Sequence, residues 1–201
     1  DRLFWKWYEK DVLQDKTLSR LKAGEILACY ASKFHEVGNA VRFSSIGAAI
    51  QGGRDASAIT IGGQNSDGSD ATTDLTMLIL DVWDGYRFHH PDVKFRWCNK
   101  TKRHHFKRLI EVMRSGMGSP SIRNDEIVIP AMLAQYPNEV TLEEARNWGI
   151  VGCITPGPTT NSKGACRRDA QYPQILKAVE FALFNGRDPQ AGFEWVHSVD
   201  T

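Results

Sequence analysis

Short apolar runs alternate along this chain with longer amphipathic segments, and this alternation restricts the fold more than any other feature of the sequence. The short runs have the length of buried strands, and the longer segments repeat apolar residues every three to four positions, as helices do. We therefore expect strands over residues 58–61, 93–97, 126–129 and 150–154, and helices over residues 71–86, 101–116 and 141–149. This order is typical of an α/β domain.

Residues with capping preferences mark the ends of these expected helices. Asp70 is placed to cap the helix that starts near residue 71, and Thr101 is placed to cap the next one. Thr141 forms a capping box with Glu144, and Gly149 closes that last helix.

Two further helical segments lie outside the alternating region. The first runs from residue 5 to about residue 30 and is expected to break at Gly24, because glycine is unfavourable inside a helix. The second is expected over residues 172–185. The first is interpreted as scaffold.

The last expected strand contains a cysteine and leads into a cluster of glycine and proline. Ile150, Val151 and Ile154 form an apolar run around Cys153, and the PGP cluster at residues 156–158 is expected to turn the chain. The thiol is therefore expected on a stiff loop that enters an apolar interior. Because a buried free cysteine usually only packs, these residues by themselves favour a structural role.

The composition excludes several functional classes. The chain has 201 residues, 41% of them hydrophobic, which suffices for the core of one domain, and its net charge of +1 provides no overall field for nucleic acid or a membrane surface. It has no signal-peptide pattern and no apolar run near the ~20 residues of a membrane-spanning helix, so a cytoplasmic protein is expected. The four cysteines are widely spaced and are expected to be free thiols.

A local basic cluster over residues 94–108 allows a different function. It combines lysines and arginines with His104 and His105 and contains Cys98, so a nucleic-acid or metal-binding module is an alternative. No pair of zinc ligands has CxxC-like spacing, and the cluster is more simply the start of an amphipathic helix. The glycine-rich loop at residues 62–68 has neither the acidic positions of an EF-hand nor a GxxxxGK[ST] phosphate loop.

Five motifs in sequence carry a specific resemblance to a known family. They are TIGGQ at residues 60–64, DGSDAT at 67–72, GSPS at 118–121, NDEIVIP at 124–130 and GIVGC at 149–153. In this order they resemble the central part of the glycyl radical enzymes, the family of pyruvate formate-lyase and the radical diol dehydratases. The resemblance covers residues 43–168. It implies that Cys153 becomes a thiyl radical that attacks substrate.

The same resemblance implies the fold and the extent of the chain. The family fold is a ten-stranded α/β barrel made of two antiparallel half-barrels, with the cysteine loop inside. Residues 1–201 are interpreted as an internal fragment of one larger catalytic domain, because both ends look cut and the C-terminal motif with the radical glycine does not occur in the sequence. The fragment alone is expected to be inactive.

The residues that follow Cys153 resemble the fumarate-adding branch of the family. Pyruvate formate-lyase has a second cysteine where this chain has Ile154, and the diol dehydratases have a basic glutamate where it has Thr155, whose hydroxyl is no base near neutral pH. Alkylsuccinate and benzylsuccinate synthases need neither group. The family pattern places their fumarate-binding arginine fifteen residues past the cysteine, at Arg168, and Arg167 completes a candidate carboxylate clamp.

Within this branch, Gly152 and Ile154 on either side of the cysteine favour an alkylsuccinate synthase. Phe43, Ile46 and Ile154 are the candidate lining of a hydrocarbon pocket. The expected reaction adds a hydrocarbon radical to fumarate to give a substituted succinate.

The resemblance also implies cofactors and partners. The radical glycine lies outside this chain, no metal is expected within it, and a separate activating enzyme carries an iron-sulfur cluster and S-adenosylmethionine. Small accessory subunits and a dimer of the complex are expected, without nucleic acid or membrane. The alternative within the family is another glycyl radical lyase, of the diol dehydratase or decarboxylase type, whose base comes from elsewhere in the chain.

Overall fold

The computed structural model describes residues 1–42, 58–88, 90–151, 155–159 and 182–185. The chain divides into two compact units, Asp1–Ala165 and Cys166–Thr201. In the second unit the description covers only one exposed helical turn at residues 182–185, so the helix expected over residues 172–185 lies mostly outside the described residues. The fold and site that follow belong to the first unit.

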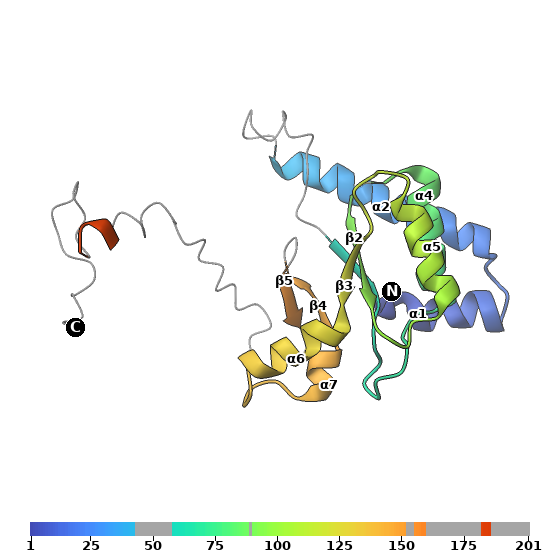
Figure 1. Ribbon diagram of the computed structural model, residues 1–201. Helices are drawn as coiled ribbons and strands as arrows, with labels where there is room; N and C mark the ends of the chain where they lie inside the picture. The colour runs from blue at the N-terminus through green and yellow to red at the C-terminus, as the bar shows by residue number, and fades with distance from the viewer. Residues whose placement is uncertain (43–57, 89, 152–154, 160–181, 186–201) are drawn as a thin grey trace. The chain divides into compact units, whose positions relative to one another are not determined.

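Three parallel strands form the main sheet of the first unit. They are β1 (Ala58–Gly62), β2 (Asp92–Trp97) and β3 (Ser121–Asn124), in the order β1-β2-β3. The connections between them contain the helices α4 (Asp74–Tyr86) and α5 (Arg103–Met113), as Figure 1 shows. The α/β architecture predicted from the alternating pattern is therefore confirmed.

The two faces of this sheet differ in chemistry. Alternate residues of β1 and β2 are apolar and buried, among them Ile61, Val93 and Phe95, and they form one core with the apolar stripes of α4 and α5. The opposite face, which we call the polar face, presents the side chains at every second position of the strands. Its polar and charged members are Thr60, Asp92, Lys94, Arg96, Ser121 and Arg123.

Three helices are described at the N-terminal end of the chain. They are α1 (Arg2–Tyr8), the short π-helix η1 (Glu9–Gln14) and α2 (Arg20–Arg42). One of them, α2, packs against α4. The predicted break at Gly24 is wrong, because Gly24 lies within α2, where an added Cβ would lie 3.4 Å from Leu78 Cδ1. The glycine thus lets α2 approach α4 closely, and the helical segment is interrupted before Ser19 instead, whose hydroxyl accepts from the Lys22 N–H at 3.1 Å.

Two predicted helix caps are also wrong. Helix α4 begins at Asp74 under a capping box made by Thr73 and Thr76, whereas Asp70 accepts from the backbone N–H of Thr72 at 3.0 Å. Helix α5 begins after Lys102, and the Thr101 hydroxyl accepts instead from the Cys98 N–H at 3.1 Å. In both places the short polar side chain accepts a hydrogen bond from a backbone N–H of the loop rather than from the first turn of the helix.

The strand predicted over residues 126–129 is a helix, α6 (Asp125–Gln135). Its N-cap is Asn124, whose side chain accepts from the Glu126 N–H at 2.9 Å, and acidic residues fill its first turn. This start stabilises a helix despite the β-branched run and the proline at position 130. The next helix, α7 (Leu142–Arg146), has the predicted capping box of Thr141 and Glu144.

A two-stranded antiparallel hairpin follows α7. It consists of β4 (Trp148–Val151) and β5 (Thr155–Pro158), and it pairs Trp148 with Pro158 and Val151 with Thr155. Gly149 therefore lies in a strand instead of closing α7, which ends at Arg146 with Asn147 as its C-cap. The PGP cluster likewise forms part of β5 rather than a turn. No helix among the described residues is long and apolar enough to cross a membrane.

Candidate active site

The hairpin that carries Cys153 crosses the polar face of the sheet. The N–H of Ile150 donates to Thr60 Oγ1 at 3.2 Å, and Arg96 Nη1 donates to the carbonyl oxygen of Trp148 at 3.0 Å. Strand β4 therefore runs from the level of Arg96 toward the level of Thr60. The next three residues, Gly152, Cys153 and Ile154, connect β4 to β5 and lie outside the described residues.

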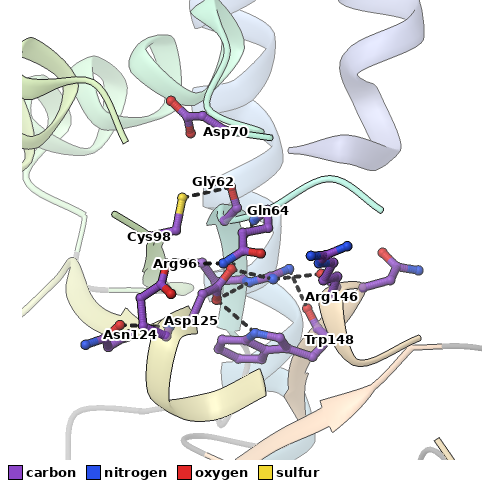
Figure 2. Close-up of polar contacts among 12 residues, drawn as sticks. Gly62, Gln64, Asp70, Arg96, Cys98, Asn124, Asp125, Arg146 and Trp148 are labelled. Carbon is purple, nitrogen blue, oxygen red and sulfur yellow. Dashed lines mark hydrogen bonds and ion pairs between the residues drawn. The ribbon is translucent and has the colours of Figure 1, made fainter. Parts of the chain in front are cut away.

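A buried ion pair fixes the base of this hairpin. Arg96 Nε donates to Asp125 Oδ1 at 3.0 Å and Arg96 Nη2 donates to Asp125 Oδ2 at 2.8 Å, with side chains only 2% and 0% exposed. Trp148 Nε1 donates to Asp125 Oδ1 at 2.9 Å, and the Arg96 guanidinium lies 4.6 Å from the centre of the Trp148 ring (Figure 2). Arginine, aspartate and tryptophan thus tie β2, α6 and β4 together.

The loop after β1 completes this network. The N–H of Gln64 donates to Asp125 Oδ2 at 3.0 Å, so the carboxylate accepts four hydrogen bonds. Gly63 has a φ of +91°, and an added Cβ would lie 2.5 Å from Arg96 Nε. Only glycine lets the backbone lie this close to the guanidinium. A buried charge pair is tolerated when its hydrogen-bonding groups are satisfied in this way.

Arg146 at the end of α7 binds the loop at residues 62–68. Arg146 Nη1 donates to the carbonyl oxygen of Ser66 at 2.8 Å, and an added Cβ at Gly68 would lie 2.7 Å from Arg146 Nη2. Lys100 Nζ donates to the carbonyl oxygen of Gly68 at 2.7 Å. The glycine-rich loop is therefore a rigid part of the scaffold that supports the hairpin.

A cavity of about 310 Å³ lies beside β4. Its wall includes Arg2, Thr60, Arg96 and Thr159 together with residues 148–150 of β4. Arg2 Nη1 donates to Asn147 Oδ1 at 2.9 Å, and burial, together with the nearby Arg96, lowers the pKa of Arg2 to about 10. The cationic side chains of Arg2 and Arg96 and the acidic residue Asp1 thus border this cavity at the base of the hairpin.

Of the residues predicted for the site, the structure describes Thr155. It begins β5 with an exposed side chain and pairs with Val151. Phe43, Ile46, Arg167 and Arg168 lie outside the described residues, as do Gly152, Cys153 and Ile154. The arginine clamp and the hydrocarbon pocket therefore stay predictions.

The sequence reasoning missed the network of Arg96, Asp125 and Trp148. A signal for it exists in β2, where Asp92, Lys94 and Arg96 alternate with buried apolar residues. Charged residues at every second position of a strand inside an α/β domain are unusual, because parallel sheets are normally covered on both faces.

The basic cluster is occupied by contacts within the fold. Arg108 donates to Asp81 at 2.9 Å and to Asp84 at 3.0 Å, which joins α5 to α4. Cys98 is fully buried, with Sγ 3.9 Å from the carbonyl oxygen of Gly63. Within the described parts of the chain, no three His, Cys, Asp or Glu side chains gather into a group able to hold a metal. These contacts agree with an amphipathic helix.

Comparison with known proteins identifies the family. Residues 1–199 match the family described as pyruvate formate lyase-like. The chain is 30% identical over 190 residues to an isethionate sulfite-lyase of Nitratidesulfovibrio vulgaris, covering 93% of this chain and 22% of the relative. It is 31% identical over 189 residues to trans-4-hydroxy-L-proline dehydratase of Clostridioides difficile, covering 91% and 22%. It spans about a fifth of the length of these relatives.

Solved structures give the same family. One describes 1,2-propanediol dehydration in Roseburia inulinivorans; it matches with a TM-score of 0.72 and 25% identity over 98% of this chain and 24% of that one. A glycyl radical enzyme from Archaeoglobus fulgidus matches with a TM-score of 0.57 and 31% identity, covering 72% and 18%. The expected fold, a fragment of the glycyl radical enzyme barrel, is confirmed.

The prediction that the chain belongs to the fumarate-adding branch of the family is not supported by these relatives. The relatives named here are a sulfite-lyase, two dehydratases and a glycyl radical enzyme without a stated reaction, and none is a fumarate-adding synthase. The match along almost the whole sequence and the shared fold nevertheless give one conclusion: this chain belongs to the pyruvate formate lyase-like family of glycyl radical enzymes.

Proposed function

We propose that the full-length protein is a glycyl radical lyase in which Cys153 takes a hydrogen atom from the substrate. The observation that carries this proposal is the anchoring of the cysteine hairpin, whose base is fixed by the buried Arg96–Asp125 pair. In the reaction an S–H bond forms at Cys153 as a C–H bond of the substrate breaks, and the product radical later recovers that hydrogen. A fixed hairpin base supports this step, because hydrogen transfer needs close and oriented reactants.

The radical glycine and its activation belong to the rest of the protein. The glycine motif does not occur in residues 1–201, so a segment outside this sequence supplies the radical to Cys153. An activating enzyme with an iron-sulfur cluster and S-adenosylmethionine generates it. The reaction requires a site that excludes water and oxygen, which would destroy a radical intermediate.

Elimination is the reaction class that the comparisons support best. The similar proteins include an isethionate sulfite-lyase and a hydroxyproline dehydratase, and their names describe loss of sulfite and of water. Thr155 stands where the diol dehydratases have a glutamate base. In an elimination the base therefore comes from another residue of the full-length chain.

Fumarate addition is the second candidate, because Thr155 favours it. Addition of a hydrocarbon radical to fumarate needs no acid or base, so a threonine at this position is no obstacle. Arg167 and Arg168 then bind the carboxylates. Small accessory subunits belong to this candidate only.

The experiment uses the full-length protein, activated without oxygen, with the glycyl radical quantified by electron paramagnetic resonance. It is given isethionate, trans-4-hydroxy-L-proline or 1,2-propanediol, and separately fumarate with hexane or toluene, and products are identified by mass spectrometry. Cys153→Ala is the test variant. Cys29→Ala is the matched control, because Cys29 is an exposed thiol on α2.

An elimination product that disappears in Cys153→Ala but persists in Cys29→Ala supports the lyase proposal. A succinate adduct with the same dependence moves the protein to the fumarate-adding branch. Product formation that survives Cys153→Ala contradicts both candidates, as does a full glycyl radical signal without turnover of any of these compounds.

A further inference from the structure

The middle of β2 carries a buried cation that the network at the hairpin base does not use. Lys94 is 3% exposed, and its ammonium group contacts the Oδ2 atom of Asp92, two residues earlier on the same face. Burying an ammonium group is costly, and a single carboxylate partner compensates only part of that cost. A buried lysine at the centre of a sheet therefore calls for an explanation beyond packing.

Two polar atoms next to this lysine have no hydrogen-bond partner among the described residues. They are the second carboxylate oxygen of Asp92, Oδ1, and the hydroxyl of Ser121, and both atoms are buried. Ser121 is the register partner of Lys94 on the neighbouring strand β3, so both side chains point to the same face. Buried polar atoms are almost always hydrogen-bonded, so these two are open to a partner outside the described residues.

The position of this cluster relates it to the cysteine hairpin. Thr60 is the register partner of Lys94 on β1, and its hydroxyl accepts the N–H of Ile150. Because β4 runs from the level of Arg96 to the level of Thr60, its direction leads toward the end of the sheet where Asp92 lies. The cluster and the described end of β4 thus share the polar face.

We propose that Asp92, Lys94 and Ser121 form a subsite for an alcohol hydroxyl group of the substrate. A hydroxyl both donates and accepts hydrogen bonds. It matches this cluster by donating to Asp92 Oδ1 while accepting from the Lys94 ammonium or the Ser121 hydroxyl. A carboxylate such as that of fumarate has no proton to donate and meets the negative charge of Asp92.

This inference rests on the proposed function and deepens it, because it selects hydroxylated substrates and hence elimination of water. Asp92, Lys94 and Ser121 are assigned a binding role, and no proton transfer is ascribed to them. The Lys94 ammonium group contacts the Asp92 carboxylate, so the subsite consists of polar groups.

The test measures equilibrium binding to the full-length protein before activation, so that it does not depend on turnover. Isothermal titration calorimetry compares trans-4-hydroxy-L-proline with L-proline and 1,2-propanediol with 1-propanol. We expect at least one hydroxylated compound to bind about 10-fold or more tightly than its deoxy counterpart, the value of a hydrogen bond to a charged group.

Ser121→Ala is the decisive variant, because it removes a hydroxyl that has no partner among the described residues, and it should leave folding unchanged. It should weaken binding of the hydroxylated compound about 10-fold and leave the deoxy compound unaffected. Asp92→Asn should act in the same direction. Ser119→Ala is the matched control: Ser119 lies two residues away, and its buried hydroxyl accepts the Val93 N–H at 2.9 Å, so its loss should lower stability without changing the preference.

The subsite is refuted if the wild-type protein shows no preference for either hydroxylated compound. An unchanged preference in Ser121→Ala also refutes it. Cys153-dependent turnover is measured separately, so the lyase proposal can stand when the hydroxyl subsite fails.

Discussion

Arg96 and Asp125 are separated by 29 residues in the sequence, yet they form a two-point ion pair with N–O distances of 3.0 and 2.8 Å and almost no exposure. Each partner also binds other elements: the arginine donates to the carbonyl oxygens of Arg146 and Trp148, and the aspartate accepts from the Gln64 N–H. The pair therefore decides where the cysteine hairpin sits on the sheet.

Loss of the negative charge at this pair should destabilise the hairpin. Asp125→Asn leaves the Arg96 guanidinium buried without its counter-charge, which costs about 3–5 kcal/mol. In the full-length protein, hydrogen exchange followed by mass spectrometry should show faster exchange in peptides that cover α6 and β4.

The control for this change is Glu111→Gln on α5. Glu111 lies 3.8 Å from Lys107 and 3.8 Å from Arg108, and its side chain is 45% exposed. A surface pair of this kind contributes between about 0 and 1 kcal/mol. Equal exchange rates in Asp125→Asn and in the wild-type protein would show that the buried pair does not hold the hairpin.

Gly63 should tolerate no side chain. In Gly63→Ala the new Cβ meets Arg96 Nε at 2.5 Å on a backbone with a φ of +91°, so the guanidinium must leave Asp125. We expect a loss of about 3 kcal/mol or more, seen as a lower thermal midpoint.

Gly116→Ala is the control that separates the cost of a left-handed backbone from the cost of the contact between an added Cβ and Arg96. Gly116 has a φ of +78° but nothing within 4 Å of an added Cβ, so only the left-handed backbone is penalised, at about 1–2 kcal/mol. If both alanine variants unfold at the same temperature, the contact between Gly63 and Arg96 is not what requires glycine.

The sequence predicts those elements of the fold whose pattern is local. The period of two in β2 and the broad apolar stripe of α4 place both elements correctly, and so does the capping box of Thr141 and Glu144. The β-branched run of Ile127, Val128 and Ile129 predicts a strand, whereas the structure has helix α6 there. Its start depends on the Asn124 cap and on the place of Asp125 in the Arg96 network, and the latter is a long-range contact.

The candidate site is predictable only in part for the same reason. Cys153 is predicted as a site residue because a family motif surrounds it, and motifs are continuous in the sequence. The partners of Arg96 come from three separate segments, and the residues near position 96 do not predict which segments these are. Thr60, Lys94 and Ser121 likewise lie side by side only because of the register of β1, β2 and β3, which the sequence does not reveal.

Thr155 should not act as the base of the reaction. Its exposed hydroxyl at the start of β5 is too weakly basic near neutral pH, so Thr155→Val should keep the kcat of the activated full-length protein within about 3-fold. Loss of a true general base costs about 10²- to 10⁴-fold. A drop of that size at an unchanged glycyl radical content would assign the hydroxyl a part in proton transfer.

His105 should make stability depend on pH. Its ring is 8% exposed on α5, and burial, together with the neighbouring His104, lowers its pKa below the ordinary value of about 6.5; Lys102 acts in the same direction and Asp70 opposes it. The folded protein then binds fewer protons than the unfolded chain as the pH falls below about 6.5, so the stabilising contribution of the neutral ring is complete above that pH and is lost below it. Thermal midpoints of the full-length protein between about pH 7 and pH 5 should fall less steeply in His105→Asn than in the wild type.

His104→Asn is the control, because His104 is exposed on the same helix. His104→Asn removes only the repulsion between His104 and His105, so the thermal midpoint should still fall with pH almost as steeply as in the wild type. If the thermal midpoint falls equally steeply in His105→Asn and in the wild-type protein, other groups control the stability at acid pH.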